Sequence, residues 1–237
     1  MSKPRSEAGS FTATRWSVVA RVGQSSANAR AAMAWLCERY WQPLYAFVRR
    51  RGYTSADAQD LTQAFFVELL ERDTITAADP QRGRFRTFLL ACLTNFLNNA
   101  HDRAQALKRG GGKVMNFAGT AIEPTDDLTP ERAFDRTWAR TLLLHVRDLL
   151  AAEHTDPRRA RVFAALEPYL VQNADAPSYI AAGTALGMSE GAIKVAVHRL
   201  RQRYREILRA EIAETLEFPE EGAVDAELQE LLAALGG

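Results

Sequence analysis

The stretch that decides the fold of this chain is "GMSEGAIKVAVHRLRQRYREIL", residues 187–208. Its apolar side chains recur every three or four residues, which is the spacing of an amphipathic helix with one face on a core. They are Ile193, Val197, Leu200, Tyr204 and Ile207. Ser189 stands where an N-cap belongs, because its hydroxyl can accept a hydrogen bond from the first helical turn. The pattern therefore predicts a helix that begins at about Ser189 and buries this stripe.

The opposite face of the predicted helix is small and polar and has a basic border. The face consists of Gly191, Val195, His198 and Gln202, and the border of Lys194, Arg199 and Arg205. A face of this kind fits a DNA major groove, while basic neighbours suit phosphate groups. The alternative is a pair of packed helices whose arginines are only solvated, since mixed charge is common on helix surfaces.

A second short helix is predicted upstream, in "SYIAAGTALGMS", residues 178–189. Gly183 and Gly187 lie four residues apart in it. A helix-turn-helix needs a very small residue where its two helices cross, and a glycine in the turn where the backbone becomes left-handed. The two segments together predict a helix-turn-helix, although glycine at position 183 should weaken the first helix by about 1 kcal/mol relative to alanine.

Charge is divided unevenly along the 237 residues, although the formal net charge is only +1. Residues 81–113 hold seven Lys or Arg against one acid, and residues 194–209 hold six against one. From residue 211 onward there are eight acids and no Lys or Arg. Hydrophobic content of 47% is that of an ordinary globular protein. Two basic segments, each able to meet an anionic partner, are thus balanced by an acidic tail.

Several functional classes find no support in the sequence. Cys37, Cys92 and the four histidines form no cluster with metal-ligand or catalytic spacing. The stretch "RGGGK", residues 109–113, lacks the spacing of a phosphate-binding loop. No apolar run approaches the about twenty residues of a membrane helix, and no signal peptide is visible. We therefore expect a cytoplasmic protein that is not an enzyme and needs no cofactor, metal or membrane.

The helical period dominates the chain, which predicts an all-α fold of two small helical domains joined by a flexible linker. A first helix is expected over residues 29–51, with Pro43 kinking or restarting it. Ser55 is the expected cap of a second helix, and a third, rich in asparagine, follows residue 84. Glycine and proline in residues 107–130 predict the linker.

Three stretches, in this order, resemble RNA polymerase sigma factors of the bacterial extracytoplasmic-function type, which keep only conserved regions 2 and 4. "DAQDLTQAFFVELL", residues 57–70, is similar to the family's core-polymerase-binding motif. "FRTFLLACLTNFLNNAHDR", residues 85–103, is similar to its minus-ten helix. Residues 178–206 are similar to its minus-thirty-five helix-turn-helix. The implied domains are 1–106 (an N-terminal extension with region 2), the linker 107–130, region 4 over 131–217, and an acidic helical extension over 218–237.

The resemblance also implies roles for individual residues. Docking on core polymerase is implied for Asp57, Asp60, Gln63 and Phe66, with Phe65 competing with Phe66 for the core. Contact with minus-ten DNA is implied for Arg82, Arg84, Arg86, Asn95, Asn99 and Arg103. Contact with minus-thirty-five DNA is implied for Ser189, Gly191, Lys194, Val195, His198, Arg199, Arg201, Gln202 and Arg203. None of these roles needs a catalytic group.

The resemblance implies a sigma factor that binds core RNA polymerase, directs it to promoter DNA and helps to open the duplex. An anti-sigma factor or another regulator is a further partner class. The alternative is a stand-alone helix-turn-helix regulator, which would bind DNA without polymerase. For the acidic tail, three hypotheses stand side by side: masking of the basic recognition helix, docking on a partner through its leucines, or packing on the second domain.

Overall fold

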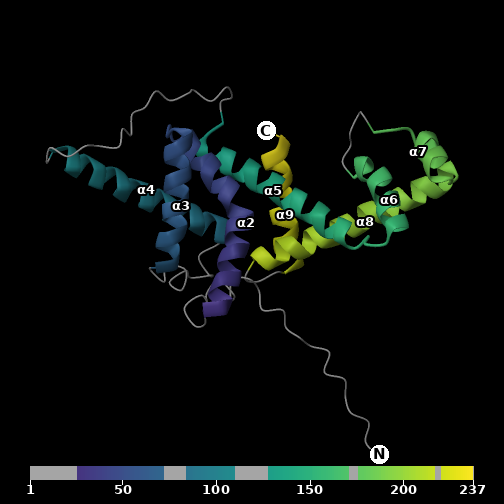
Figure 1. The fold of residues 1–237 in the computed structure, drawn as a ribbon, viewed down its shortest axis with the longest axis horizontal. Helices are drawn as coiled ribbons and strands as arrows, with labels where there is room; N and C mark the ends of the chain where they lie inside the picture. Colours follow the sequence, from purple (N-terminus) through teal and green to yellow (C-terminus); the bar gives the residue numbers. More distant parts are fainter. Residues whose placement is uncertain (1–25, 72–83, 110–127, 171–175, 217–219, 237) are drawn as a thin grey trace, which may run out of the picture. The chain divides into compact units, whose positions relative to one another are not determined.

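The computed structural model describes residues 26–71, 84–109, 128–170, 176–216 and 220–236. Every regular element in these ranges is a helix (Figure 1), which confirms the predicted all-α class. In chain order they are α2 (Ser26–Arg50), α3 (Ser55–Glu71), α4 (Phe85–Arg109), α5 (Pro130–Ala152), α6 (Pro157–Leu166), the short 3-10 helix η2 (Glu167–Tyr169), α7 (Tyr179–Leu186), α8 (Glu190–Thr215) and α9 (Glu221–Gly236).

Contacts within the chain divide it into two compact units. The first comprises the described residues up to 134 together with 213–223, and the second comprises 135–212 and 224–236. Helices α5 and α8 each contribute residues to both units. The domain limits expected from the sequence remain a proposal.

The first unit has an aromatic and aliphatic core between α2, α3 and α4. Tyr40 and Phe85 lie 5.5 Å apart between ring centroids, and Phe65 lies 5.6 Å from Phe96. All four rings are buried. Each buried side chain of this size stabilises a fold by about 1.5–3 kcal/mol. These contacts hold the outer faces of α3 and α4 in place.

One local prediction for the first unit is wrong in part and a second is wrong by one residue. Helix α2 runs through Pro43 without a break, so of the two expected effects of Pro43, a kink or a restart, the restart does not occur. Leu44 and Phe47 are buried just beyond Pro43, and their packing keeps the chain helical. The cap of α3 is Thr54 and not Ser55, because the Thr54 hydroxyl accepts a hydrogen bond from the Asp57 N–H at 3.2 Å.

The stripe predicted for residues 193–207 is confirmed in the second unit. Ile193, Val197, Leu200 and Ile207 are buried in α8. Tyr204 is half-buried, and its hydroxyl donates to the Leu143 carbonyl on α5 at 3.0 Å. Burial raises the pKa of Tyr204 to about 12. The predicted cap is also confirmed, since the Ser189 Oγ accepts from the Ala192 N–H at 3.2 Å.

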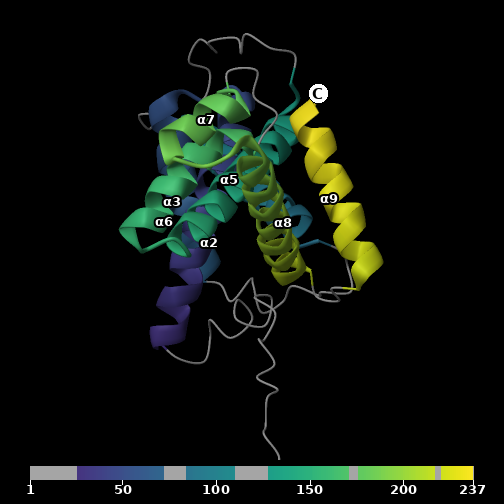
Figure 2. The ribbon, with the colours of Figure 1, turned by 90° about the vertical axis from the view of Figure 1, so that its right-hand side faces the viewer.

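Helices α7 and α8 form the predicted tight turn (Figure 2), with a bend of 100° between them. Gly187 has φ +67, the left-handed conformation expected for it. The Met188 N–H donates to the Gly183 carbonyl at 2.8 Å and so closes the end of α7. A Cβ on Gly183 would lie 2.6 Å from the Met188 carbonyl oxygen, which explains why this position is glycine.

No single helix in the described ranges combines the length and the apolar character of a membrane span; α7 and α8 do so only as a bent pair, by length and composition.

Helix α9 lies beside α8 (Figure 2), and Asp225 forms an ion pair with Arg209. Val224 and Leu231 of α9 are buried. Arg209 lies seven residues beyond Gln202, at the far end of the basic segment of α8. This contact favours the hypothesis that the tail packs on the second unit over the hypothesis that it masks the recognition face.

Candidate functional site

The outer face of α3 presents part of the predicted polymerase-docking set. Asp60 and Gln63 are exposed. Asp57 is half-buried, and its carboxylate accepts a hydrogen bond from the Thr54 hydroxyl at 2.7 Å, so it helps to start the helix. Two of the four predicted residues are therefore available on this face without rearrangement.

Phe66 corrects the prediction that its ring lies on that face. It is only 4% exposed, and its ring stacks on Trp41 at 5.7 Å between centroids and 10° between planes. Phe65 is also buried, so both phenylalanines belong to the core. The apolar stripe of α3 is wide enough to cover two successive positions, which spacing alone does not reveal.

Val67 is a large apolar residue of α3 that is exposed, at 46%. It follows Gln63 by four residues and Asp60 by seven, so the three residues share one face of the helix. Counting from the two polar residues would have found it. We define the docking face of α3 as Asp60, Gln63 and Val67.

Helix α4 presents a polar face that carries half of the predicted minus-ten set. Asn95, Asn99 and Arg103 are exposed and follow one another at intervals of four residues. Asn98 is exposed beside them. Amide side chains on one surface both donate and accept hydrogen bonds, which suits the edges of unpaired bases.

The other predicted minus-ten residues behave differently. Arg86, at the start of α4, is only 8% exposed and is engaged within the chain, which corrects its placement on the surface. Arg84 is half-buried and also has a partner within the chain. Arg82 lies outside the described residues. Of the predicted arginines, Arg103 is the one that the structure places on an exposed surface.

The recognition face of α8 is exposed along its length. It consists of Gly191, Val195, His198 and Gln202. Val195 is 51% exposed, so its methyl groups are available to a partner. A Cβ on Gly191 would meet nothing within 4 Å, so nothing inside the described chain requires glycine there. Ser189 is exposed next to the start of this face.

The basic border of the recognition face is only partly free. Arg199 is exposed and makes no ion pair with any residue in the described ranges. The Lys194 Nζ lies 2.7 Å from the Glu190 carboxylate, one turn earlier on the same helix. This contact raises the pKa of Lys194. Exposed pairs of this kind are weak, so Lys194 can still exchange its partner for a phosphate.

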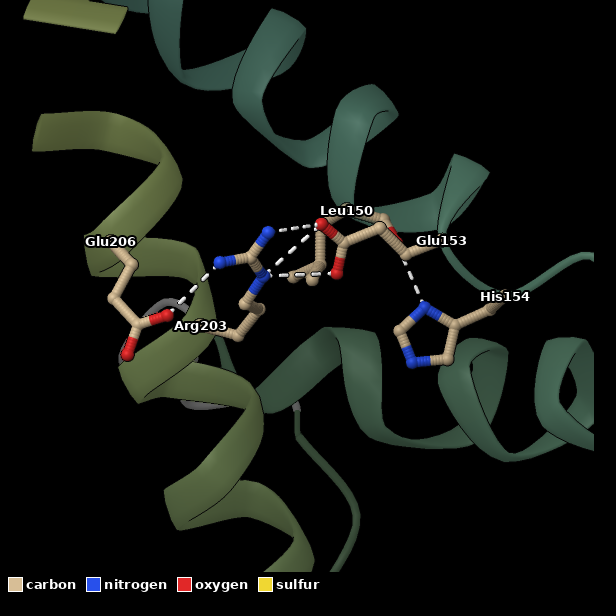
Figure 3. Close-up of polar contacts among 5 residues, drawn as sticks. All are labelled: Leu150, Glu153, His154, Arg203 and Glu206. Carbon is tan, nitrogen blue, oxygen red and sulfur yellow. Dashed lines mark hydrogen bonds and ion pairs between the residues drawn. The ribbon is translucent and has the colours of Figure 1, made fainter. Parts of the chain in front are cut away.

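Arg201 and Arg203 are held in contacts that join α8 to the rest of the second unit. The Arg201 Nε donates to the Tyr169 carbonyl at 2.7 Å. Arg203 grips Glu153, at the turn after α5, with Nε and Nη2 at 3.0 and 2.6 Å, and its Nη1 lies 3.0 Å from Glu206 (Figure 3). The hydrogen bond from Arg203 lowers the pKa of Glu153. Arg201 thus positions the recognition helix, which corrects the expectation that it lies open to phosphates. Arg203 is 50% exposed and its partner Glu153 is 40% exposed, so Arg203, like Lys194, can exchange its partner for a phosphate.

Within the described ranges, no group of three or more His, Cys, Asp or Glu side chains could hold a metal ion. Cys37 and Cys92 are half-buried, and burial raises the pKa of both thiols. Neither thiol is therefore activated as a nucleophile at neutral pH.

One comparison with known proteins gives a family. The family model described as Sigma-70 region 2 matches residues 36–106, which is less than a third of the 237 residues. No curated protein and no solved structure matches the chain significantly. The matched segment contains the second part of α2, all of α3 and most of α4, and so both the docking face and the asparagine-rich face. Residues 36–106 are therefore similar to the second conserved region of sigma-70 factors.

Proposed function

We propose that this protein is a sigma factor of the extracytoplasmic-function type, with region 2 in its first unit and region 4 in its second. The observation that carries the proposal is the region 2 match over a segment whose α3 and α4 both present exposed polar faces. The helix-turn-helix of α7 and α8 supports a second DNA contact. We keep residues 107–130 as linker, 131–217 as region 4 and 218–237 as an extension.

In this proposal the docking face of α3 binds core RNA polymerase in the cytoplasm. Asp60 supplies a charge, Gln63 a hydrogen-bonding amide and Val67 an apolar contact, a mixture suited to a specific interface. The binding free energy that three side chains can supply is modest. An anti-sigma factor or another regulator that bound the docking face would compete with core polymerase for it.

The asparagines of α4 would hold bases of the separated promoter strand. An unpaired base loses its stacking and pairing partners, and the protein must replace them if the duplex is to stay open. Asn95 and Asn99 offer donors and acceptors one turn apart, and Arg103 offers a charge for the backbone. The protein needs only binding groups for this task, because melting breaks no covalent bond.

The recognition face of α8 would read the minus-thirty-five element in the major groove. Val195 suits a thymine methyl group, and Gln202 suits an adenine edge. Arg199 and Lys194 would contact phosphates on either border of the groove.

The proposal is tested by co-purification with core RNA polymerase. We expect the wild-type protein to bind, and Asp60→Ala with Gln63→Ala to weaken binding by about tenfold, which corresponds to about 0.7 kcal/mol for each of the two side chains. Both side chains are exposed, so the fold should be retained. Gln42→Ala, at an exposed site on α2, is the matched control and should bind as wild type does.

A wild-type protein that fails to bind polymerase and instead protects duplex DNA alone would replace this proposal with the stand-alone regulator. If polymerase binds equally well to the wild type and the double variant, the sigma role stands but the docking face lies elsewhere.

Gly191→Ala tests the recognition face independently. We expect it to preserve or raise the thermal stability, because alanine is favoured over glycine in a helix by up to about 1 kcal/mol and its Cβ meets nothing. Binding of the polymerase complex to promoter DNA should nevertheless weaken several-fold, since glycine lets the backbone come close to a partner. Unchanged promoter binding, measured by fluorescence anisotropy, would mean that DNA does not approach α8 at this position.

A further inference from the structure

The turn between α5 and α6 forms a cleft of about 590 Å³ that the proposed function does not use. It is lined by Glu153, His154, Asp156, Arg158, Arg159 and Val162. Its volume lies in the range of ligand-binding clefts, and four of its six lining side chains carry charge at neutral pH. A charged group in this cleft can bind a ligand only if it is not already paired within the chain.

The two acids of the cleft are already committed within the chain. Glu153 receives the guanidinium of Arg203, as Figure 3 shows. Asp156 caps α6, since its Oδ1 accepts from the Arg158 and Arg159 N–H groups at 3.0 and 3.1 Å. The acids therefore hold local structure together, and neither forms an ion pair with the side chain of Arg158 or Arg159.

His154 is fixed as well. Its Nδ1 donates to the Leu150 carbonyl at 2.8 Å (Figure 3). Its ring also lies 5.1 Å from that of Phe163 between ring centroids. It therefore forms a fixed wall of the cleft.

The arginines are the uncommitted groups of the cleft. Both side chains are exposed, and neither has a hydrogen bond or ion pair with any residue that the structure describes. Arg161, on the same helix, offers a contrast, because it donates to the Ala185 carbonyl at 3.1 Å and so supports the end of α7. Both guanidinium groups line the cleft without a partner, so each can donate hydrogen bonds to an anion, and phosphate oxygens match the geometry of these donors.

The cleft is connected to the recognition helix α8 through the ion pair between Glu153 and Arg203. Glu153 lines it and binds Arg203, which follows Arg199 by one turn of α8. Arg199 borders the recognition face and is itself exposed. We expect a DNA strand that runs past Arg199 toward Arg203 to reach this cleft, where Arg158 and Arg159 offer unpaired positive charge.

We propose that Arg158 and Arg159 form a phosphate clamp, a second contact to the DNA backbone outside the recognition helix. This inference rests on the proposed function, because it needs α8 to lie in a major groove. The clamp carries no sequence information and fixes the orientation of the second unit on the duplex. It contributes affinity that depends on salt.

The test is a salt titration of promoter-duplex binding by the full-length protein with core polymerase. Each phosphate contact adds about 0.9 to the slope of log K against log salt, so Arg158→Gln with Arg159→Gln should reduce the slope by about 2. The loss of affinity should be the same for matched and mismatched minus-thirty-five sequences. Arg140→Gln, at an exposed arginine of α5 outside the cleft, is the control and should keep the wild-type slope.

The outcomes separate this inference from the function on which it rests. If the wild-type complex binds promoter DNA and the double variant keeps its slope, the clamp is wrong and the proposed function stands. If the wild-type complex does not bind promoter DNA, both fail together. A second measurement compares the thermal stability of the wild type and the double variant in inorganic phosphate at matched ionic strength. If phosphate stabilises the wild type but not the double variant, and the salt slope of DNA binding is the same for both, the cleft binds a free phosphate-bearing ligand and the clamp is wrong.

Discussion

Phe66→Ala is expected to lower the free energy of unfolding of the first unit by about 3–5 kcal/mol. The Phe66 ring is 4% exposed, stacks on Trp41 and lies 6.2 Å from Phe65 between ring centroids. Truncation removes this apolar area and leaves a cavity that two rigid aromatic neighbours cannot easily fill. Chemical denaturation followed by tryptophan fluorescence would measure the loss, because Trp41 lies against the ring.

Val67→Ala is the matched control, one residue further along α3. Its side chain is 46% exposed, so the substitution should change stability by no more than about 0.5 kcal/mol. In the polymerase assay, by contrast, we expect Val67→Ala to bind core polymerase more weakly than the wild type does, although this variant keeps its fold. Wild-type stability in Phe66→Ala would contradict the buried placement and return that ring to the docking surface that the sequence suggested.

The burial of Phe66 and the exposure of Val67 could not be predicted from the sequence of α3 alone. The helical period identified α3, and it identified the buried stripe of α8 at Ile193, Val197 and Ile207, because periodicity is a local property of the chain. How wide an apolar stripe becomes depends on what packs against it. Phe66 is buried because Trp41 on α2 covers it, and no spacing within α3 contains that information.

The arginines of α8 show the same limit for charge. Arg201 and Arg203 stand in a basic segment, so the sequence placed them on phosphates. Their actual partners are Tyr169 and Glu153, which lie 32 and 50 residues away in the chain. Local charge counts cannot reveal a distant acid or carbonyl. Arg199 and Gln202 kept their predicted exposure, because no distant segment of the described chain covers them; Gln202 only donates to Glu206, one turn along the same helix, at 3.4 Å.

The predicted N-cap of α3 was wrong for a more local reason. Thr54 and Ser55 are adjacent, and both are good N-cap residues. The choice is made by Asp57, whose N–H and carboxylate both bond to the Thr54 hydroxyl. The prediction was off by one position, which is the usual uncertainty of helix ends.

Gly183→Ala is the second large effect, and two opposing terms decide its sign. Helix propensity alone would make alanine more stable by about 1 kcal/mol in α7. Against this, the new Cβ would lie 2.6 Å from the Met188 carbonyl oxygen, a distance that real Cβ atoms do not adopt. Forcing extra atoms into a packed site typically destabilises by about 1–3 kcal/mol.

The Met188 carbonyl cannot move away cheaply, and this settles the sign. The Met188 N–H is tied to the Gly183 carbonyl at 2.8 Å, and the preceding residue, Gly187, is fixed in the left-handed conformation. Shifting the turn would also move Ser189, whose hydroxyl caps α8. We therefore expect Gly183→Ala to destabilise the second unit by about 2 kcal/mol overall and to weaken binding to the minus-thirty-five element. Gly191→Ala makes the same chemical change where there is open space, so the two variants should shift the unfolding midpoint in opposite directions. A rise in both would show that the α7–α8 turn yields to the methyl group, and that Gly183 is then only a weak point in α7.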